Sequence, residues 1–353
     1  MQLSELGYDR WFEAYAAETC REGQCVARVS AVDRNSFLVM NESGEIPAEL
    51  SGKFLYALDS TLDMPCTGDW VAVQYYNDGA SAIIHGLFPR KTVLRRKTAG
   101  TAVEFQMIAA NIDTAFIIQS CQYDFNLSRL DRYLAMVTNG HVEPVIILTK
   151  TDLVSPEELQ EKLASLNHAG MTARVLALSN VTGAGYEEFR QLLQHRRTYC
   201  LIGSSGVGKT TLLNRLIGRD EFETGMVSGT GEGTHTTTRR QLIVLDNGSM
   251  FIDTPGMREL GLLGAAEGIE KGFEEIVRLA ANCRFTDCSH TNEAGCAVLS
   301  ALEGGELDGK RYASYMKLRR ESEYHEMSYL EKRNKDRAFG RMVKKVKKDI
   351  NRW

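Results

Sequence analysis

Proline and long apolar runs are scarce in this chain of 353 residues, which holds only 6 prolines. No segment approaches the ~18 consecutive apolar residues that a membrane-spanning helix needs. Residues 1–15 carry acidic and aromatic side chains instead of the basic and then apolar pattern of a secretory signal. We therefore expect a soluble, cytoplasmic protein without a membrane partner. The chain length predicts two or three domains.

Cysteine is also sparse and unevenly placed. Of the 8 cysteines, five are scattered, and we expect them to be free thiols in a reducing compartment. The other three lie close to a histidine, in the set Cys283, Cys288, His290 and Cys296. Three thiolates and one imidazole make a complete tetrahedral ligand set, so this cluster predicts one structural zinc ion. Chance clustering is the alternative.

An overall excess of basic charge is missing as well, because the formal net charge is −4. The average hides an asymmetry: residues 310–353 hold 15 Lys and Arg against 6 Asp and Glu, a net charge of +9 that leaves −13 elsewhere. Such a basic arm predicts a segment that meets phosphate. A second basic run, residues 90–97, is either a mobile, solvated loop or a phosphate contact.

The chain divides into three regions with different hydrophobic patterns. Residues 1–98 hold short alternating strands between turn residues, which is typical of a small β-barrel of the oligonucleotide-binding (OB) type, or of a plain β-cap. Residues 99–270 alternate apolar strands with helical stretches, which predicts a largely parallel α/β sheet. Residues 271–353 are mostly helical and contain the zinc cluster. We therefore expect a multidomain fold with a barrel, an α/β domain and a helical zinc-binding domain.

The strands expected in the second region are short apolar segments. They cover residues 114–119, 144–148, 174–178, 199–202, 241–245 and 250–252. The helical stretches expected between them cover residues 127–139, 156–169 and 210–217. Ligands of open α/β sheets bind at the carboxyl ends of the strands, so the residues that follow these strands are candidates for a site.

A phosphate-binding loop follows the fourth of these strands. Residues 203–210 read GSSGVGKT, which matches the pattern G-x-x-x-x-G-K-[ST] between a strand and a helix. Its glycines let main-chain N–H groups turn toward phosphate oxygens, Lys209 reaches the terminal phosphates, and Thr210 can bind Mg²⁺. The predicted nucleotide-binding residues here are Gly203, Ser204, Ser205, Gly206, Val207, Gly208, Lys209, Thr210 and Thr211.

Two polar segments further along the chain complete the expected triphosphate site. Asp253 ends a strand in the sequence DTPG, where its carboxylate can hold the Mg²⁺ shell and the Gly256 N–H can sense a γ-phosphate. Residues 229–240 are rich in Gly and Thr, which suits a loop that orders around Mg²⁺, or a flexible hairpin. The threonines at 236–238 can each supply the Mg²⁺-binding hydroxyl, and we take Thr237 as the candidate.

A candidate base site lies earlier in the chain, where residues 149–152 read TKTD. The sequence resembles the guanine-reading motif [NT]-K-x-D, in which the carboxylate accepts two hydrogen bonds that adenine cannot supply. Thr149 replaces the usual Asn with a group that has fewer hydrogen-bonding atoms. A second base motif is expected at Ser179, although Asn180 stands where Ala is usual. The predicted base-binding residues are Thr149, Lys150, Thr151, Asp152 and Ser179.

These motifs occur in an unusual order, because the base motifs precede the phosphate loop. The sheet can stay the same, since a permutation only moves the break in the chain. Together, the barrel, TKTD, GSSGVGKT, HTTT, DTPG and the Cys/His cluster resemble the circularly permuted, ribosome small-subunit-dependent GTPase A family over the whole chain. The resemblance implies a weak GTPase that assists late maturation of the small ribosomal subunit and is strongly stimulated by it. It also implies zinc on the four Cys and His residues.

The residue that orients the attacking water is not the usual one. Many GTPases place Gln after the DxxG motif, whereas this chain has Met257, which cannot donate a hydrogen bond. His235 lies beside the Thr run, and a neutral imidazole can orient or partly deprotonate water. The family resemblance points to the same histidine. We take His235 as the catalytic candidate; the alternative is a histidine that only packs in a loop.

Two other function classes fit parts of the pattern. One is a nucleotide-gated RNA-binding module whose hydrolysis is incidental, and the other is a P-loop ATPase or kinase. Asp152 argues against the second, because its carboxylate suits guanine. The expected partners are GTP and GDP with Mg²⁺, the small ribosomal subunit and its rRNA, and other assembly factors. We expect the protein to be a monomer.

Overall fold

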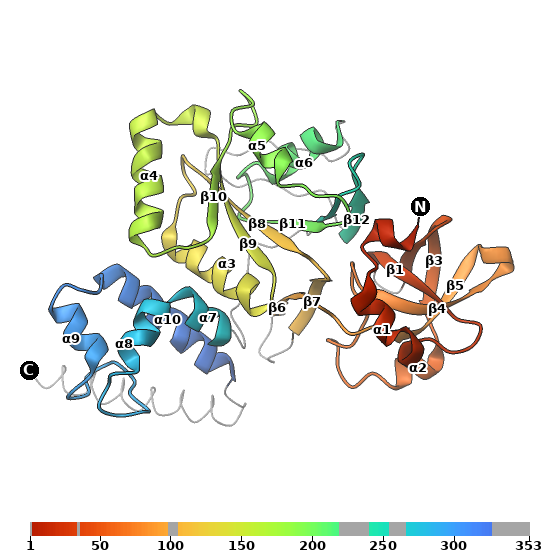
Figure 1. Ribbon diagram of the computed structural model, residues 1–353, viewed down its shortest axis with the longest axis horizontal. Coiled ribbons are helices and arrows are strands. Elements are labelled where there is room, and N and C mark those ends of the chain that lie inside the picture. The colour runs from red at the N-terminus through yellow and green to blue at the C-terminus, as the bar shows by residue number, and fades with distance from the viewer. Residues whose placement is uncertain (1, 34–35, 98–104, 219–239, 254–265, 327–353) are drawn as a thin grey trace, which may run out of the picture.

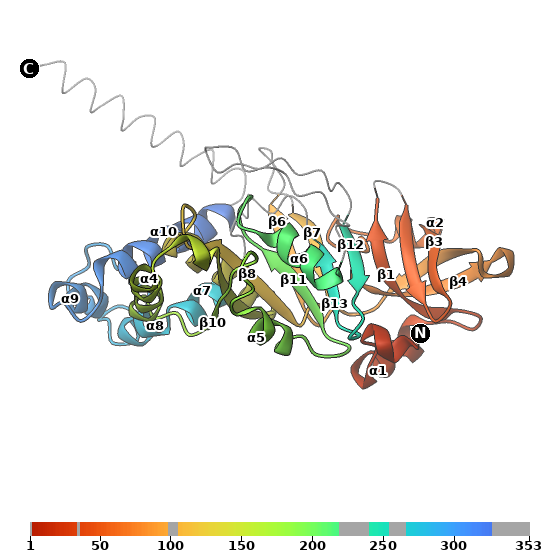
Figure 2. The ribbon, with the colours of Figure 1, turned by 90° about the horizontal axis from the view of Figure 1, so that it is seen from above.

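The computed structural model describes residues 2–33, 36–97, 105–218, 240–253 and 266–326. These residues form three units in a row: a β-barrel, a central α/β unit and a helical unit (Figure 1). The view from above shows the same order (Figure 2). Among the helices in these ranges, none combines the length and the hydropathy of a membrane span. The multidomain fold class expected from the sequence is confirmed.

The barrel is a sheet of five strands that closes on itself. The strands follow the order β1-β2-β3-β5-β4, and an additional pairing of β1 with β4 completes the ring. Its interior is filled by compact side chains, and Val29, Val39, Val71 and Ile84 are fully buried. The strands are β1 (Cys25–Val32), β2 (Phe37–Asn41), β3 (Gly44–Leu50), β4 (Trp70–Tyr76) and β5 (Ser81–Leu87).

The barrel region also contains helices that the strand pattern did not predict. They are η1 (Leu3–Leu6), α1 (Arg10–Thr19), α2 (Gly52–Tyr56) and η2 (Asn77–Gly79). Helix α1 begins after Asp9, whose side chain accepts a hydrogen bond from the Trp11 N–H as an N-cap. Its buried residue Phe12 packs against Trp70 of β4, with ring centroids 5.7 Å apart. The first helix therefore packs onto the barrel.

The central unit is built on a sheet with the order β10-β9-β8-β11-β13-β12. Neighbouring strands pair in parallel except β12 and β13, which form an antiparallel pair. The predicted strands are confirmed, with ends that differ by about one residue. They are β8 (Thr114–Ser120), β9 (Glu143–Thr149), β10 (Arg174–Ala177), β11 (Thr198–Ile202), β12 (Arg240–Val244) and β13 (Met250–Asp253).

Helices connect the strands of this sheet and set its functional edge. They are α3 (Leu127–Asn139), η3 (Thr151–Leu153), α4 (Pro156–His168), α5 (Tyr186–Gln191) and α6 (Lys209–Ile217). Helix α4 starts with a capping box between Ser155 and Glu158. Strand β11 follows β8, β9 and β10 in the chain but lies between β8 and β13 in the sheet. Because these strands are parallel, their carboxyl ends meet at one edge.

A two-stranded sheet decides against one of the two interpretations of the basic run at residues 90–97. Strand β6 (Val93–Lys97) pairs antiparallel with β7 (Phe105–Ala110), so this part of the run is not a mobile loop, and the phosphate contact stays a prediction. Arg90 is bound to the fully buried Asp69, with 2.7 Å between Nη2 and Oδ2. A charged run looks the same in the sequence whether its members are solvated or paired, because the partner is distant in the chain.

The helical unit lies beside α3 (Figure 1). It consists of α7 (Ala266–Gly272), α8 (Glu274–Ala280), α9 (Ala297–Glu303) and α10 (Gly309–Glu326). Helix α7 crosses α3 at Gly268, where an added Cβ would lie 2.0 Å from the Ala135 carbonyl oxygen. Only glycine allows this close approach of two main chains. The helical unit therefore packs against the central unit at a helix crossing.

Candidate functional site

The phosphate loop connects β11 to α6 at the carboxyl edge of the sheet. Gly203, Gly206 and Gly208 all have positive φ angles, of 153°, 75° and 98°. A Cβ on Gly203 would lie 2.3 Å from the carbonyl oxygen of Ile118 in β8. The loop conformation therefore requires glycine, as the sequence pattern predicts. Helix α6 begins at Lys209, so its N-terminus faces the site.

Two cationic side chains hold Ser204 in this loop. The Nζ of Lys209 donates to the carbonyl oxygens of Gly203 at 2.8 Å and Ser204 at 2.5 Å, so this ammonium lies across the loop. Arg129, in the first turn of α3, donates from Nη1 to the Ser204 Oγ at 2.6 Å and also to Asp124. The sequence analysis missed Arg129, because its contact with the loop spans residues far apart in the chain. Ser204 is thus fixed through both its carbonyl and its hydroxyl.

The residues expected around Mg²⁺ are only partly described. Thr210 and Thr211 lie in the first turn of α6, and Asp253 is the last residue of β13. Ile252 pairs with Cys200 of β11, so Asp253 lies at the same sheet edge as the phosphate loop. The other predicted members of the site lie outside the described residues; they are His235, Thr237 and Gly256.

The base-binding residues come together from the ends of two neighbouring strands. Asp152 lies in η3 after β9, and Ser179 follows β10. The Ser179 Oγ donates to Asp152 Oδ1 at 2.5 Å and accepts the main-chain N–H groups of Val181 and Thr182. These bonds fix the orientation of the carboxylate that the sequence assigns to guanine. Lys150 has a left-handed conformation with φ of 57°, and Thr151 opens η3.

Asn180 has a larger role in the site than its sequence position suggested. Its Nδ2 donates to the carbonyl oxygen of Gly208 in the phosphate loop at 3.1 Å. Its own carbonyl oxygen accepts from Nη1 of Arg215 in α6 at 3.0 Å. The Arg215 guanidinium also lies 4.0 Å from the ring centroid of Tyr186. The loop after β10 is therefore tied to both the phosphate loop and the helix that follows it.

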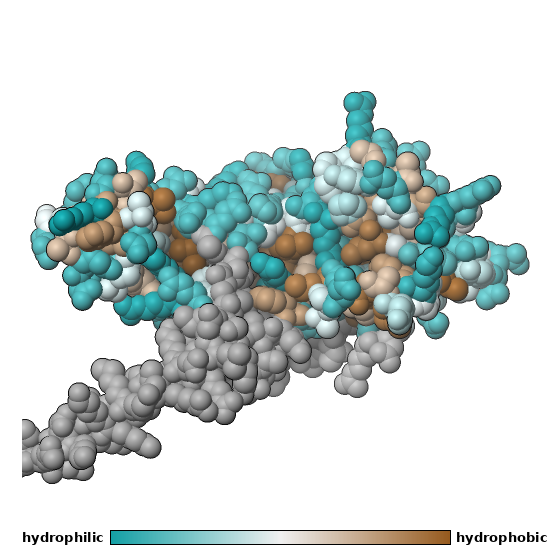
Figure 3. Space-filling model, turned by 90° about the horizontal axis from the view of Figure 1, so that it is seen from below, coloured by the Kyte–Doolittle hydropathy of each residue, from teal (hydrophilic) through white to brown (hydrophobic). Residues whose placement is uncertain are grey.

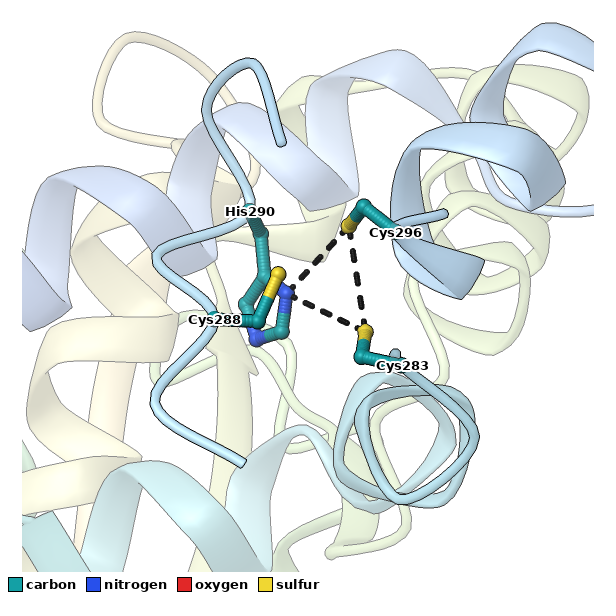
Figure 4. Close-up of side chains that lie close together, drawn as sticks. All are labelled: Cys283, Cys288, His290 and Cys296. Atoms are coloured by element: carbon teal, nitrogen blue, oxygen red, sulfur yellow. Dashed lines mark hydrogen bonds between the residues drawn. The ribbon is translucent and has the colours of Figure 1, made fainter. Parts of the chain in front are cut away.

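The predicted metal cluster is assembled, with all four ligand atoms within 4.8 Å of one another. Cys283 Sγ lies 3.8 Å from Cys296 Sγ, and His290 Nδ1 lies 3.6 Å and 3.4 Å from these two sulfurs (Figure 4). A tetrahedral zinc ion with ordinary bond lengths separates two sulfurs by about 3.8 Å and a sulfur from a nitrogen by about 3.5 Å. The described donor set therefore fits a tetrahedral metal ion.

Neighbouring groups orient the ligands of the cluster. Burial lowers the pKa of His290 below its ordinary value, which keeps the imidazole neutral and able to bind a metal. Cys296 caps α9, and its sulfur accepts the Leu299 N–H at 3.4 Å. The Tyr312 hydroxyl donates to the carbonyl oxygen of His290 at 2.6 Å, so α10 supports the ligand loop. These contacts place the cluster between α8, α9 and α10.

Comparisons with known proteins agree over the length of the chain. The RsgA GTPase family matches residues 87–263. A small ribosomal subunit biogenesis GTPase RsgA from Opitutus terrae is 39% identical over 334 residues, which are 92% of this chain and 90% of that protein. The crystal structure of YjeQ from Thermotoga maritima has a TM-score of 0.63 and 26% identity, and it covers 84% of this chain and 97% of that one.

A second solved structure supports the fold alone. It is YloQ, a circularly permuted GTPase, with a TM-score of 0.61 and 23% identity over 87% of this chain and 98% of that one. Its similarity agrees with the observed order, in which the base motifs on β9 and β10 precede the phosphate loop after β11.

Proposed function

Because the chain belongs to the RsgA GTPase family and is a P-loop enzyme that hydrolyses GTP to GDP and phosphate, we propose that it assists late maturation of the small ribosomal subunit. The observation that carries this proposal is the 39% identity over 92% of the chain to a protein named for small ribosomal subunit biogenesis. We propose further that the subunit stimulates hydrolysis. A cytoplasmic location follows from that role.

The nucleotide site of this proposal is the carboxyl edge of the central sheet. Asp152, held by Ser179, reads guanine, and the stem of Lys150 packs on the base. Lys209 and the main-chain N–H groups of residues 203–211 bind the phosphates. Mg²⁺ binds through Thr210, with Asp253 and Thr237 in its shell and the Gly256 N–H beside the γ-phosphate. The support is that every described member of this set lies at one sheet edge.

A structural zinc ion on Cys283, Cys288, His290 and Cys296 completes the proposal. Thiolate and imidazole donors at tetrahedral spacing suit Zn²⁺, and four protein ligands leave no position for a substrate. When bound, the ion joins the loop 283–296 to the ends of α8 and α9. The donor residues are nearly all buried, which suits a structural site.

Ribosomal RNA is the proposed macromolecular partner, reached through the barrel and the basic arm 310–353. In its described part, Lys310, Lys317 and Arg320 of α10 are exposed. The face in Figure 3 carries apolar patches over its middle among hydrophilic residues. A monomer stays an expectation. The division into domains at residues 1–98, 99–270 and 271–353 is part of the same proposal, and contact with other assembly factors is a further expectation.

The test is GTP turnover by the full chain with and without purified small ribosomal subunits. We expect stimulation by about 100-fold or more, as for GTPases whose site is completed by a partner. Lys209→Ala is the control for turnover by contaminating enzymes, because it removes the cation from the phosphate loop. Equal turnover with and without subunits would refute the ribosomal role and leave the GTPase activity intact.

A second arm tests His235 and separates the proposal from a binding module with incidental hydrolysis. We expect His235→Ala to bind GTP and the subunit normally, to lose stimulated turnover and to stay on the subunit in GTP. Stimulated turnover at the unaltered rate would remove His235 from the mechanism. If the variant leaves the subunit as fast as the unaltered protein, hydrolysis is incidental to release.

A further inference from the structure

The two departures from the usual guanine motifs lie on either side of one stretch of the phosphate loop. Thr149 stands where Asn is common, and Asn180 stands where Ala is common. In the structure, Thr149 Oγ1 donates to the Val207 carbonyl oxygen at 2.6 Å, and Asn180 Nδ2 donates to the Gly208 carbonyl oxygen at 3.1 Å. The two unusual residues therefore contact consecutive carbonyls of the phosphate loop from two different base loops.

The hydroxyl of Thr149 alone provides limited support. It has one proton, and two carbonyl oxygens compete for it: that of Val207 at 2.6 Å and that of Gln119 at 3.2 Å. An asparagine at this position would bring an amide with two donor hydrogens. Position 149 has no amide, but position 180 has one, in the side chain of Asn180. The Asn180 Nδ2 packs closely on Gly208, since it would lie 2.9 Å from a Cβ added to that glycine.

The presence of an amide at position 180 is not explained by a need to satisfy buried hydrogen-bonding groups. The Gly208 carbonyl already accepts the Leu212 N–H at 3.0 Å, so it needs no second donor. Asn180 Oδ1 is buried and has no hydrogen-bond partner in the described structure. A buried acceptor without a partner lowers stability. An alanine at this position would leave no group unsatisfied, so the contribution of the amide is its contact with the loop.

We propose that Thr149 and Asn180 are paired positioning residues that hold the phosphate loop in register with the guanine site. The proposal rests on the nucleotide site of the proposed function and is independent of the ribosomal partner. Fixing the two half-sites relative to each other raises the affinity for a whole nucleotide above what its separate parts achieve. The affinities for GDP and GTP should rise equally, because both nucleotides place phosphates in the phosphate loop that these two residues hold.

The test compares Asn180→Ala with the double variant Thr149→Asn/Asn180→Ala, which restores the usual residues at both positions. Affinities for GDP, GTP and guanosine are measured by competition with a fluorescent guanine nucleotide, without ribosomal subunits, and the melting temperature is recorded. Asn180→Ala should bind GDP and GTP about five- to tenfold more weakly and should bind guanosine as well as the unaltered protein does. Its melting temperature should be unchanged or higher. The double variant should recover nucleotide affinity to within about threefold. Asn167→Ala, the same change at an exposed asparagine of α4, is the matched control and should change nothing.

Three outcomes would overturn the proposal. Unchanged GDP affinity in Asn180→Ala would show that the contact has no function. An equal loss for guanosine would assign Asn180 to the base site itself. Failure of Thr149→Asn to restore affinity in the double variant would show that the two positions do not share a role. Since none of these measurements involves the ribosome, their failure leaves the ribosomal proposal untouched, and loss of ribosomal stimulation leaves this one untouched.

Discussion

The central sheet is joined to the barrel by strand pairing and to the helical unit by helix packing. On the barrel side, β1 pairs antiparallel with β12, in the register Ala31 with Gln241 and Val32 with Arg240. The pairing makes one 11-stranded sheet of the barrel and the central unit. On the helical side, α3 packs against α7 and α10 without any strand pairing. The first junction depends on strand hydrogen bonds, and the second on helix packing that combines a close main-chain approach at Gly268 with side-chain contacts.

A buried arginine reinforces the main-chain junction. Arg28 of β1 is 1% exposed and donates to the carbonyl oxygens of Leu6 at 2.6 Å, Gly68 at 3.2 Å and Asn111 at 3.0 Å. One side chain thus connects the N-terminal segment, the barrel and the central unit. Burial lowers the pKa of Arg28 to about 10, so it is still charged at pH 7.

An ion pair is central to the side-chain junction. Arg311 of α10 donates from Nη1 to Asp131 of α3 at 2.8 Å, and both side chains are 5% exposed. Arg311 also donates to Glu275 of α8 at 2.6 Å, and Ser314 donates to Asp131 at 2.6 Å. The two junctions therefore differ in what can disturb them. Burial raises the pKa of Asp131 on the helical side, whereas Arg28 on the barrel side keeps its charge at pH 7.

The two junctions also follow different segments of the predicted nucleotide site. Strand β12 begins directly after residues 219–239, which contain most of the Gly- and Thr-rich segment, and it pairs with the barrel. Helix α7 begins directly after residues 254–265, which contain the rest of the DTPG motif, and it packs on α3. By chain order, the Gly- and Thr-rich segment leads to the barrel and the DTPG motif to the helical unit.

The largest effect should come from metal removal, and only on the helical side. Structural zinc contributes ~10 kcal/mol or more to small metal-binding domains. Cys296→Ser should lose the ion and the hydrogen-exchange protection of α8, α9 and α10, while the barrel amides stay protected. Elemental analysis should give about one zinc per unaltered chain. Cys25→Ser, the same change at an exposed cysteine of the barrel, should keep the zinc ion and the hydrogen-exchange protection of the helices. Loss of barrel protection in Cys296→Ser would show that the junctions are not independent.

Arg28→Met should be the most damaging single change on the barrel side. The apolar side chain has a similar length but leaves the Leu6 and Asn111 carbonyls without this donor, at a cost of about 3 kcal/mol. The free energy of unfolding in urea measures the loss. Arg21→Met, at an exposed arginine just before β1, should change stability by less than ~0.5 kcal/mol. If the two variants unfold at the same urea concentration, Arg28 does not hold the junction.

Gly268→Ala should loosen the helical junction without touching its ion pair. The added methyl group would lie 2.0 Å from the Ala135 carbonyl oxygen, so α7 must shift away from α3. Overpacking of this kind costs about 2 kcal/mol. Gly272→Ala on the same helix is the control, because a Cβ there meets no atom within 4 Å. Thermal unfolding of the two variants gives the comparison, and equal midpoints would mean that the crossing adapts without strain.

Local patterns predicted much of this molecule. The loop 203–210 and the Cys/His cluster could be predicted from the spacing of their residues, and the TKTD segment from its motif together with its place at the end of a strand. Helix α3 could be predicted to the residue, because Asn126 caps it and the apolar periodicity continues to Asn139. Strands β8, β9, β11 and β13 could be predicted because most of their residues are buried, which gives short apolar runs.

The parts that could not be predicted depend on pairs that are distant in the chain. Asn180 and Gly208, or Arg28 and Asn111, are brought together only by the fold. The burial of Arg28 could not be predicted from the strand sequence CVARVSAV, because an arginine in a strand is ordinarily exposed. Arg90 was misread for the same reason, since its partner Asp69 precedes it by 21 residues.

The smallest expected change in stability comes from removing the charge of Asp131. Whether that change stabilises or destabilises the protein tests how the helical junction differs from the barrel junction. Burial raises the pKa of Asp131, and the hydrogen bond from Ser314 and the charge of Arg311 only partly oppose it. The carboxylate therefore gains less from its partners than it loses by leaving water. An amide at this position would keep an oxygen for Arg311 and bury no charge. Asp131→Asn should therefore change stability at pH 7 by less than ~1 kcal/mol. Arg311→Met, which leaves two carboxylates behind, should cost about 3 kcal/mol.

The pH dependence gives the decisive readout for Asp131. Because its pKa is raised by folding, the folded protein holds this proton more tightly than the unfolded chain does. Its contribution to stability is therefore present below the ordinary aspartate value of about 3.9 and is lost as the pH rises through the raised value. The difference in unfolding free energy between the unaltered protein and Asp131→Asn isolates this group, since all other groups titrate in both. That difference should fall as the pH rises through this window. A difference that grows with pH would mean that Arg311 outweighs burial, and that the ion pair itself stabilises the helical junction.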